Sequence, residues 1–138
     1  EVVLSPHITP QWLEALFNMK GTVNQIHRKI VPSMYAAIPK DVIAASVYDK
    51  GEMIGTGLGI LDRDYVGLYA IHVADKYRGS HIGRSICLSL LNAATRQGAS
   101  SAYLQVVQGN IPAKNLYRSL GFEDFYTYWF RQQYPVKN

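Results

Sequence analysis

The alternation of apolar and polar residues divides this chain into short strands and short helices. Strand-like runs, rich in β-branched and aromatic residues and bounded by turn residues, cover residues 2–4, 42–48, 53–61, 65–73, 102–107 and 125–131. Apolar residues three and four apart, between capping and breaking residues, predict four helices. They run from Pro10, with Thr9 as its N-cap, to Gly21, from Thr22 to about Ile30, from the end of a loop at Gly83 to Gly98, and from Pro112 to Gly121. Residues 34–38 fit neither pattern.

The order of these elements predicts the fold class. A strand, a helix and a strand follow one another between residues 65 and 107, which predicts two parallel strands joined by a right-handed crossover. Tight turns at residues 49–51 and 62–64 predict antiparallel hairpins before it. We therefore expect a single domain over residues 1–138, of the α/β (mixed α+β) class, with a central mixed, mostly antiparallel sheet flanked by helices.

Three glycines leave one face of the predicted strand 53–61 without side chains. Gly55, Gly57 and Gly59 are two residues apart, so they share a face. Such a face admits either a ligand or backbone at close range, or a bulky helix packed on top. The sequence leaves both explanations open.

Composition and charge restrict the partners. The 138 residues are 48% hydrophobic and carry a net charge of +4, which suits a polyanionic ligand but is modest for a protein that binds nucleic acid. No apolar run approaches the roughly 20 residues that span a membrane. We expect no nucleic-acid, membrane or metal partner, and the sequence leaves the oligomeric state open.

One cysteine bears on the compartment and the chemistry. Cys87 is the only cysteine, which excludes an internal disulfide and a CxxC zinc site and fits a reducing cytosol. We therefore expect a cytoplasmic protein. Cys87 also lies on the apolar stripe of its helix, so we expect it in the core.

The chain starts at Glu1, which trimming, processing or excision from a longer protein would each explain.

The loop between strand 65–73 and the following helix is the strongest chemical signal. It reads Arg78-Gly79-Ser80-His81-Ile82-Gly83. A short loop with glycines that opens a helix presents backbone N–H groups and the positive helix end to an anion. With Arg78 and Arg84 on either side, the natural ligand is a phosphate or a pyrophosphate.

Two segments carry a resemblance to a known family. Residues 73–84 resemble the acetyl-CoA pyrophosphate loop of the GCN5-related N-acetyltransferase (GNAT) superfamily, with the pattern (Gln/Arg)-x-x-Gly-x-(Gly/Ala). Residues 110–117, Asn-Ile-Pro-Ala-Lys-Asn-Leu-Tyr, followed by Leu120-Gly121-Phe122, resemble its second signature. The similarity is close over residues 65–131 and looser over residues 1–40, and the chain resembles the C-terminal domain of a two-domain member.

The resemblance implies an N-acetyltransferase that uses acetyl-CoA. It implies that the loop binds the pyrophosphate, that the pantetheine arm lies along strand 65–73, and that an N–H near Val73 polarises the thioester carbonyl. It also implies Tyr117 as the general acid for the departing thiolate. The residues expected to bind the cofactor are Ile71, His72, Val73, Arg78, Gly79, Ser80, His81, Ile82, Gly83, Arg84, Ser85, Asn110 and Tyr117.

This sequence departs from the family pattern at two positions. His81 stands where the loop usually has glycine, and we expect it to adopt the helical φ/ψ of a first turn. Gln105 stands where some members carry a catalytic glutamate, so that base is missing, and a water relay or another group takes the amine proton. Alternation along the strand predicts that His72 points into the layer opposite Ile71 and Val73.

Structural roles compete with the catalytic ones. Tyr117 also fits a core aromatic residue, and Asn110 also fits a simple helix cap.

The function that we predict is acetyl transfer to a primary amine of a small molecule or peptide. The alternatives are a catalytically silent domain that senses acyl-CoA together with a missing N-terminal domain, and a scaffold that binds nothing.

Overall fold

The computed structural model describes residues 1–20, 41–105, 111–121, 123–126 and 129–133. Within this part of the chain the strands are β1 (Val2–Ser5), β2 (Val42–Asp49), β3 (Glu52–Asp62), β4 (Tyr65–Val73), β5 (Ser101–Gln105), β6 (Glu123–Tyr126) and β7 (Trp129–Gln133). The helices are α1 (Pro10–Lys20), the short 3-10 helix η1 (Asp75–Tyr77), α3 (Ile82–Arg96) and α4 (Ile111–Ser119). The predicted helix 22–30 and residues 34–38 lie outside the described residues.

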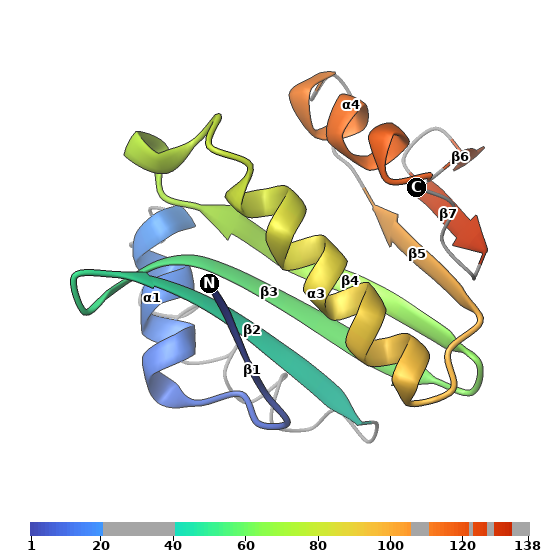
Figure 1. The fold of residues 1–138 in the computed structure, drawn as a ribbon, viewed down its shortest axis with the longest axis horizontal. Coiled ribbons are helices and arrows are strands. Elements are labelled where there is room, and N and C mark those ends of the chain that lie inside the picture. Colours follow the sequence, from blue (N-terminus) through green and yellow to red (C-terminus); the bar gives the residue numbers. More distant parts are fainter. Residues whose placement is uncertain (21–40, 106–110, 122, 127–128, 134–138) are drawn as a thin grey trace.

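The strands of the described residues form one seven-stranded sheet in the order β1-β2-β3-β4-β5-β7-β6. Only β4 and β5 run parallel, and the other neighbouring pairs are antiparallel. Helix α3 connects β4 to β5 and lies across one face of the sheet (Figure 1). The predicted crossover and the predicted mixed sheet are therefore confirmed.

The glycine-lined face of β3 lies beneath α3. A Cβ atom on Gly57 would lie only 2.4 Å from Cγ2 of Ile86, and one on Gly55 would lie 3.1 Å from Cδ1 of the same residue. Ile86 and Leu90 of α3 are fully buried there. Of the two explanations for these glycines, the packed helix is correct, because it fills the space that a ligand would need.

Helix α1 covers the opposite face. Thr9 caps it as predicted, since its Oγ1 accepts a hydrogen bond from the N–H of Trp12 at 3.2 Å. The indole of Trp12 is buried and donates to the carbonyl of Ala45 at 2.9 Å. Trp12 and Leu16 form a second, smaller core with Leu58 of β3.

The C-terminal aromatic run differs from the prediction. Residues 125–131 were expected to form one strand, but this expectation is wrong, because β6 and β7 are separate antiparallel strands. β7 also pairs with β5 and so lies between β5 and β6. Aromatic residues favour strands, but the run contains no glycine or proline that signals a reversal.

In the part of the chain that is described, no helix combines the length and the apolar character that crossing a bilayer requires.

We expect Gly57→Ala to destabilise the fold by about 1–3 kcal/mol, because the added methyl would overlap Ile86 and force α3 outward. Gly59→Ala is the matched control on the same strand and face, since its Cβ would meet its nearest neighbour at 3.3 Å. Urea unfolding measures the free energy of unfolding of both variants and of the wild type. Equal stability of the two variants would contradict the packing described here.

Candidate functional site

The two parallel strands of the sheet separate part-way along their length. β4 and β5 are paired from Tyr65↔Ser101 to Leu68↔Leu104, whereas β4 continues to Val73. Figure 1 shows the two strands starting side by side and diverging toward the beginning of α3. Among the described residues, β4 has no strand partner on this side beyond Leu68. We call the space beside residues 69–73 on this side of β4 the fork; its edge can receive an extended ligand as an additional strand.

A β-bulge lies where the strands separate. The register of β3 against β4 shifts between Thr56 and Leu58, so that Gly57 lies opposite two residues of β4. One of the two is Ala70, whose φ is 54°. The hydroxyl of the fully buried Thr56 donates to the carbonyl of Ala70 at 2.9 Å. This hydrogen bond holds the irregular backbone in place inside the fold.

The backbone of Val73 faces the fork. Val73 lies opposite Gly55, and the adjacent ladder bond runs from the N–H of Ala74 to the carbonyl of Ile54 at 2.8 Å. This arrangement makes Val73 and Gly55 a non-hydrogen-bonded pair, whose own N–H and C=O groups point away from each other's strand. The carbonyl of Val73 accepts a hydrogen bond from Nε of Arg78 at 3.4 Å. The N–H of Val73 therefore also points into the fork.

The loop before α3 contains two residues with positive φ. Gly79 has a φ of 83°, a conformation that favours glycine. His81 has φ 66° and ψ 16°, which is the left-handed region. The prediction that His81 adopts helical φ/ψ is therefore wrong; the chain reverses at this residue to start α3, and histidine enters this region more readily than most residues. A left-handed residue followed by helical ones arranges successive N–H groups into a concave anion-binding nest.

Helix α3 begins with donors that have no acceptor within the helix. The first hydrogen bond of the helix runs from the N–H of Ser85 to the carbonyl of His81 at 3.0 Å. The N–H groups of residues 82–84 come before this bond and have no acceptor within the helix. The His81 side chain does not cap them. These groups and the positive helix end are the donors that the predicted anion site requires.

Helix α4 and the end of β4 lie beside this helix start. A Cβ on Gly83 would be 3.5 Å from Cδ2 of Leu116 and 3.9 Å from Cγ2 of Val73. The guanidinium of Arg84 donates to Oγ of Ser119 on α4 at 2.8 Å. The structure thus brings together the end of β4, the loop, the start of α3 and α4.

Side chains of the loop also secure it. The hydroxyl of Ser80 donates to the carbonyl of Tyr77, and the hydroxyl of Tyr77 donates to the carboxylate of Asp49 on β2. Arg78 forms an ion pair with Asp75 at 3.1 Å, in which both side chains are largely exposed. Exposed pairs of this kind contribute little stability, so the Arg78 guanidinium can turn toward an anion at low cost.

Tyr117 lies in the main core. Its side chain is 8% exposed and belongs to the same cluster as Cys87 and Leu104. Burial raises the pKa of Tyr117 above its ordinary value, and the neighbouring Cys87 adds to the shift. The residue packs as a core aromatic, and its phenol stays protonated at neutral pH, which is the state that a general acid needs.

His72 points to the other face of the sheet. Ile71 and Val73 pack against the core beneath α3. His72 lies opposite Thr56 of β3. Thr56 lies between Gly55 and Gly57, which face α3, so Thr56 and His72 are on the other face. The prediction that His72 points into the opposite layer is confirmed. Its predicted contribution to cofactor binding stays a prediction.

One feature of the fork was missed in the sequence. The hydroxyl of Tyr69 donates to the hydroxyl of Tyr103 at 3.2 Å, and the two rings meet above Gly67. An isolated glycine inside strand 65–73 was the available signal for such a close approach. Asn110 and the side chain of Gln105 lie outside the described residues.

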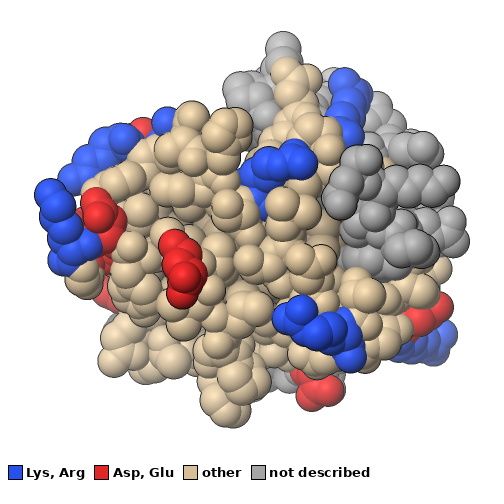
Figure 2. Space-filling view, viewed as in Figure 1, with Lys and Arg blue, Asp and Glu red and all other residues tan. Residues whose placement is uncertain are grey.

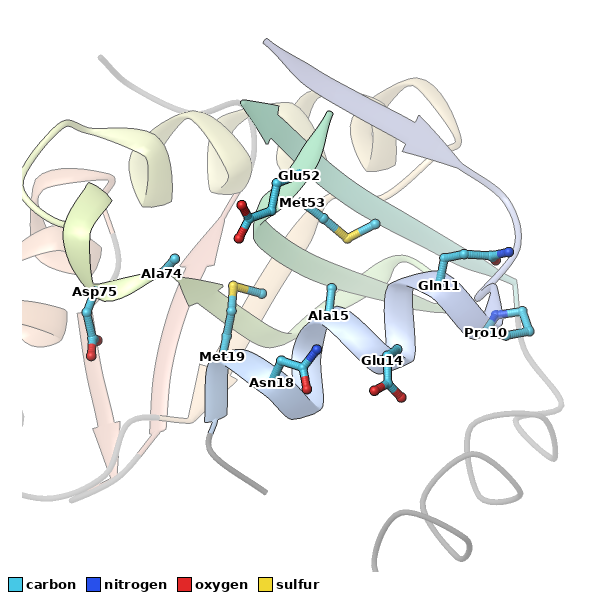
Figure 3. A pocket seen from close by; sticks show the side chains of 10 residues that line it. All are labelled: Pro10, Gln11, Glu14, Ala15, Asn18, Met19, Glu52, Met53, Ala74 and Asp75. Atoms are coloured by element: carbon cyan, nitrogen blue, oxygen red, sulfur yellow. The ribbon is translucent and has the colours of Figure 1, made fainter. Parts of the chain in front are cut away.

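A separate hollow of about 750 Å³ lies between α1, the start of β3 and the two residues that follow β4. It is lined by Pro10, Gln11, Glu14, Ala15, Asn18, Met19, Glu52, Met53, Ala74 and Asp75. In Figure 3 the side chains of Met19 and Met53 project toward each other, and the Glu14 carboxylate points away from the strands. None of the described lining residues is among residues 69–73 of β4 or belongs to β5, so this hollow is distinct from the fork.

The basic residues do not form a continuous patch on the face that carries α3. Figure 2 shows lysine and arginine side chains in separate groups, divided by uncharged surface, among the residues coloured there. A binder of nucleic acid typically gathers its basic side chains along one face. The coloured part of this face has no such arrangement.

A sequence profile decides the family. The profile described as the acetyltransferase (GNAT) family matches residues 11–122, which includes β4, the loop, α3 and α4. This chain belongs to the GNAT family. The resemblance drawn from residues 73–84 and 110–122 is therefore confirmed.

A curated relative of this GNAT chain is the uncharacterized N-acetyltransferase YobR of Bacillus subtilis, 27% identical over 120 residues. The match covers 87% of this chain and 48% of YobR, so the chain spans about half the length of that relative.

Solved structures share the GNAT fold. The ribosomal-protein-S18-alanine N-acetyltransferase of Escherichia coli superposes with a TM-score of 0.76 at 18% identity, covering 100% of this chain and 97% of that one. The PaiA N-acetyltransferase of Thermoplasma acidophilum, in complex with coenzyme A, superposes with a TM-score of 0.71 at 15% identity, covering 97% of this chain and 99% of that one. At these identities the likeness shows the fold alone.

We expect Cys87 to resist alkylation by iodoacetamide in the folded protein and to react rapidly in concentrated guanidinium chloride. Burial raises the pKa of this thiol from 9.0 to about 12, so little thiolate forms. Because the folded pKa lies above the unfolded one, burial of the thiol stabilises the fold below about pH 9, and this contribution is lost as the pH rises through about 12. Mass spectrometry measures the labelling; rapid modification of the native protein near pH 8 would contradict the burial.

Proposed function

We propose that this chain is an acetyl-CoA-dependent N-acetyltransferase whose acceptor is a primary amine of a small molecule or peptide. The observation that carries the proposal is the fork, where the open edge of β4 meets the N-terminal N–H groups of α3. Membership of the GNAT family supports acetyl transfer. The coenzyme A complex of the Thermoplasma acidophilum neighbour supports the choice of cosubstrate.

The residues at the fork fit the parts of acetyl-CoA. The N–H groups of residues 79–84 and the guanidinium of Arg78 would hold the pyrophosphate, because they combine backbone donors with a positive charge. The backbone of Ile71 and Val73 would pair with the amides of the pantetheine arm, as in strand addition. Acetyl-CoA supplies the thioester: the amine nitrogen bonds to its carbonyl carbon while the carbon–sulfur bond breaks.

The N–H of Val73 would stabilise the negative charge that develops on the carbonyl oxygen. It points into the fork and is held by the ladder bond of its neighbour Ala74. A donor fixed in advance needs no reorganisation during the reaction, and removing such a donor typically costs about 3 kcal/mol.

Tyr117 would act as the general acid. The sulfur leaves with the electron pair of the broken bond and takes the phenol proton, which Tyr117 regains from water. Burial raises the pKa of Tyr117, and it also raises the pKa of a thiol that leaves into the same dry surroundings, so burial does not widen the gap between the two pKa values by the full shift of Tyr117. The nitrogen releases its own proton to water.

The acetyl group would pass directly to the amine. The alternative, a covalent relay through cysteine, needs a reachable thiolate. Cys87 is fully buried within α3 and its thiol is held neutral. Neither condition for a nucleophilic cysteine is met.

Two measurements test the proposal. Calorimetric titration with acetyl-CoA should show binding at one site per chain, and the chain should release free thiol with at least one amine among spermidine, kanamycin and a peptide that begins with alanine. Binding without thiol release would instead favour the silent sensing domain. Absence of binding would favour the scaffold.

We expect Tyr117→Phe to lower kcat at least tenfold while the Kd for acetyl-CoA changes less than twofold. The substitution removes the proton donor but keeps the buried ring, and general acids typically contribute about 10²–10⁴-fold. Tyr48→Phe, at a 48% exposed position on β2, is the matched control and should leave both constants unchanged. A collapse of acetyl-CoA affinity with kcat intact would contradict the role of Tyr117.

A further inference from the structure

Tyr69 and Tyr103 form a phenol pair on the face of the sheet opposite α3. Gly67 of β4 lies directly opposite Tyr103 of β5, and Tyr69 lies two residues farther along β4, so the three positions share a face. Tyr69 packs against the smaller core that contains Trp12 of α1. Tyr117, by contrast, lies in the main core beneath α3.

The geometry of the pair is closely determined. The two hydroxyl oxygens are 3.2 Å apart, and the rings meet edge to face with centroids 6.4 Å apart. A Cβ on Gly67 would lie 2.7 Å from Cε2 of Tyr69 and 2.8 Å from Cζ of Tyr103. Any other residue at this position would displace a ring. Both tyrosines are half-buried, so part of each remains accessible.

The pair lies where β4 and β5 separate. The last paired residues are Leu68 and Leu104; Tyr69 directly follows Leu68, and Tyr103 directly precedes Leu104. The phenol pair therefore connects the two strands at the closed end of the fork.

The two faces at this point differ in access. On the α3 side, Leu104, Cys87 and Tyr117 are buried in one continuous core, so an amine that entered from that side would have to open the core. An acceptor has to reach the fork from the α1 side, which is the side on which the phenols lie.

We propose that the Tyr69–Tyr103 phenol pair binds the primary amine of the acceptor and positions it for attack. The inference rests on the proposed acetyl transfer and adds the acceptor subsite to it. A phenol oxygen accepts a hydrogen bond from the amine N–H, and the ring faces attract the ammonium form before it loses its proton. The amine then enters the fork from the face opposite Tyr117.

The pair positions the amine without removing its proton. Burial raises the pKa of Tyr69, and its hydrogen bond to Tyr103 raises it further. The Tyr69 phenol therefore stays neutral at the pH at which an amine attacks, and the proton leaves to water.

The test uses Tyr69→Phe and Tyr103→Phe, which keep the rings and remove one hydroxyl each. With the best amine of the panel named above, we expect KM for the amine to rise about fivefold to tenfold, as for one lost hydrogen bond. The Kd for acetyl-CoA should stay unchanged, and the urea midpoint should fall only slightly and equally in the two variants, because each loses the hydrogen bond between the two phenols. Calorimetric binding of the same amine to the chain saturated with coenzyme A should weaken by the same factor.

Two control variants separate the fork from other surfaces. Tyr48→Phe removes an exposed phenol far along the sheet, and Glu52→Gln removes a carboxylate from the hollow of Figure 3. Neither should change KM. A higher KM in Glu52→Gln, with both tyrosine variants unaffected, would place the acceptor in the hollow and overturn the inference.

The remaining outcomes distinguish this inference from the proposed function. If the tyrosine variants keep the wild-type KM and amine affinity while the wild type acetylates the amine, the phenol pair has no role in acceptor binding and acetyl transfer stands. If the wild type binds no acetyl-CoA or acetylates no amine of the panel, the proposed function fails and this inference fails with it.

Discussion

Among the described residues, the pairing of β4 with β5 ends at Leu68 and Leu104, and the arrangement of the site follows from this interruption. A strand edge carries a row of N–H and C=O groups that are costly to leave unpaired in a dry environment. The β-bulge at Ala70, which the buried Thr56 hydroxyl secures, lies where the paired part of β4 gives way to the open part. The open part then presents Val73 in a fixed direction, as a partner for an extended ligand.

The two faces of the sheet differ in how closely they are packed and in how accessible their side chains are. On one face, glycines of β3 let α3 approach so closely that the space beneath it is filled. That face is dry, and dryness keeps both Tyr117 and Cys87 protonated. On the other face, a glycine of β4 makes room for two tyrosine rings that remain half-accessible. The sheet itself thus separates the proposed proton donor from the proposed entry for the amine.

The anion site that we propose relies mainly on the backbone. Arg78 and Arg84, the two cations at the loop, are paired with Asp75 and Ser119, whereas the N–H groups of residues 82–84 lie at the open end of α3. Backbone donors are fixed by the helix and lose little conformational freedom when an anion binds. A chain with a net charge of only +4 would therefore be able to hold the diphosphate of the proposed cosubstrate.

Local patterns along the chain were enough to predict the β4–α3–β5 crossover, the loop at residues 78–83 and the capping of α1 by Thr9. Each depends on residues that are close in sequence: hydrophobic periodicity, glycines in a turn, a hydroxyl three residues before an N–H. The left-handed conformation of His81, the division of residues 125–131 into two strands, and the pairing of Tyr69 with Tyr103 were not predictable in this way. These features depend on contacts between segments that are distant along the chain, and such contacts form only when the sheet assembles and forces each backbone and ring into the space that its neighbours leave.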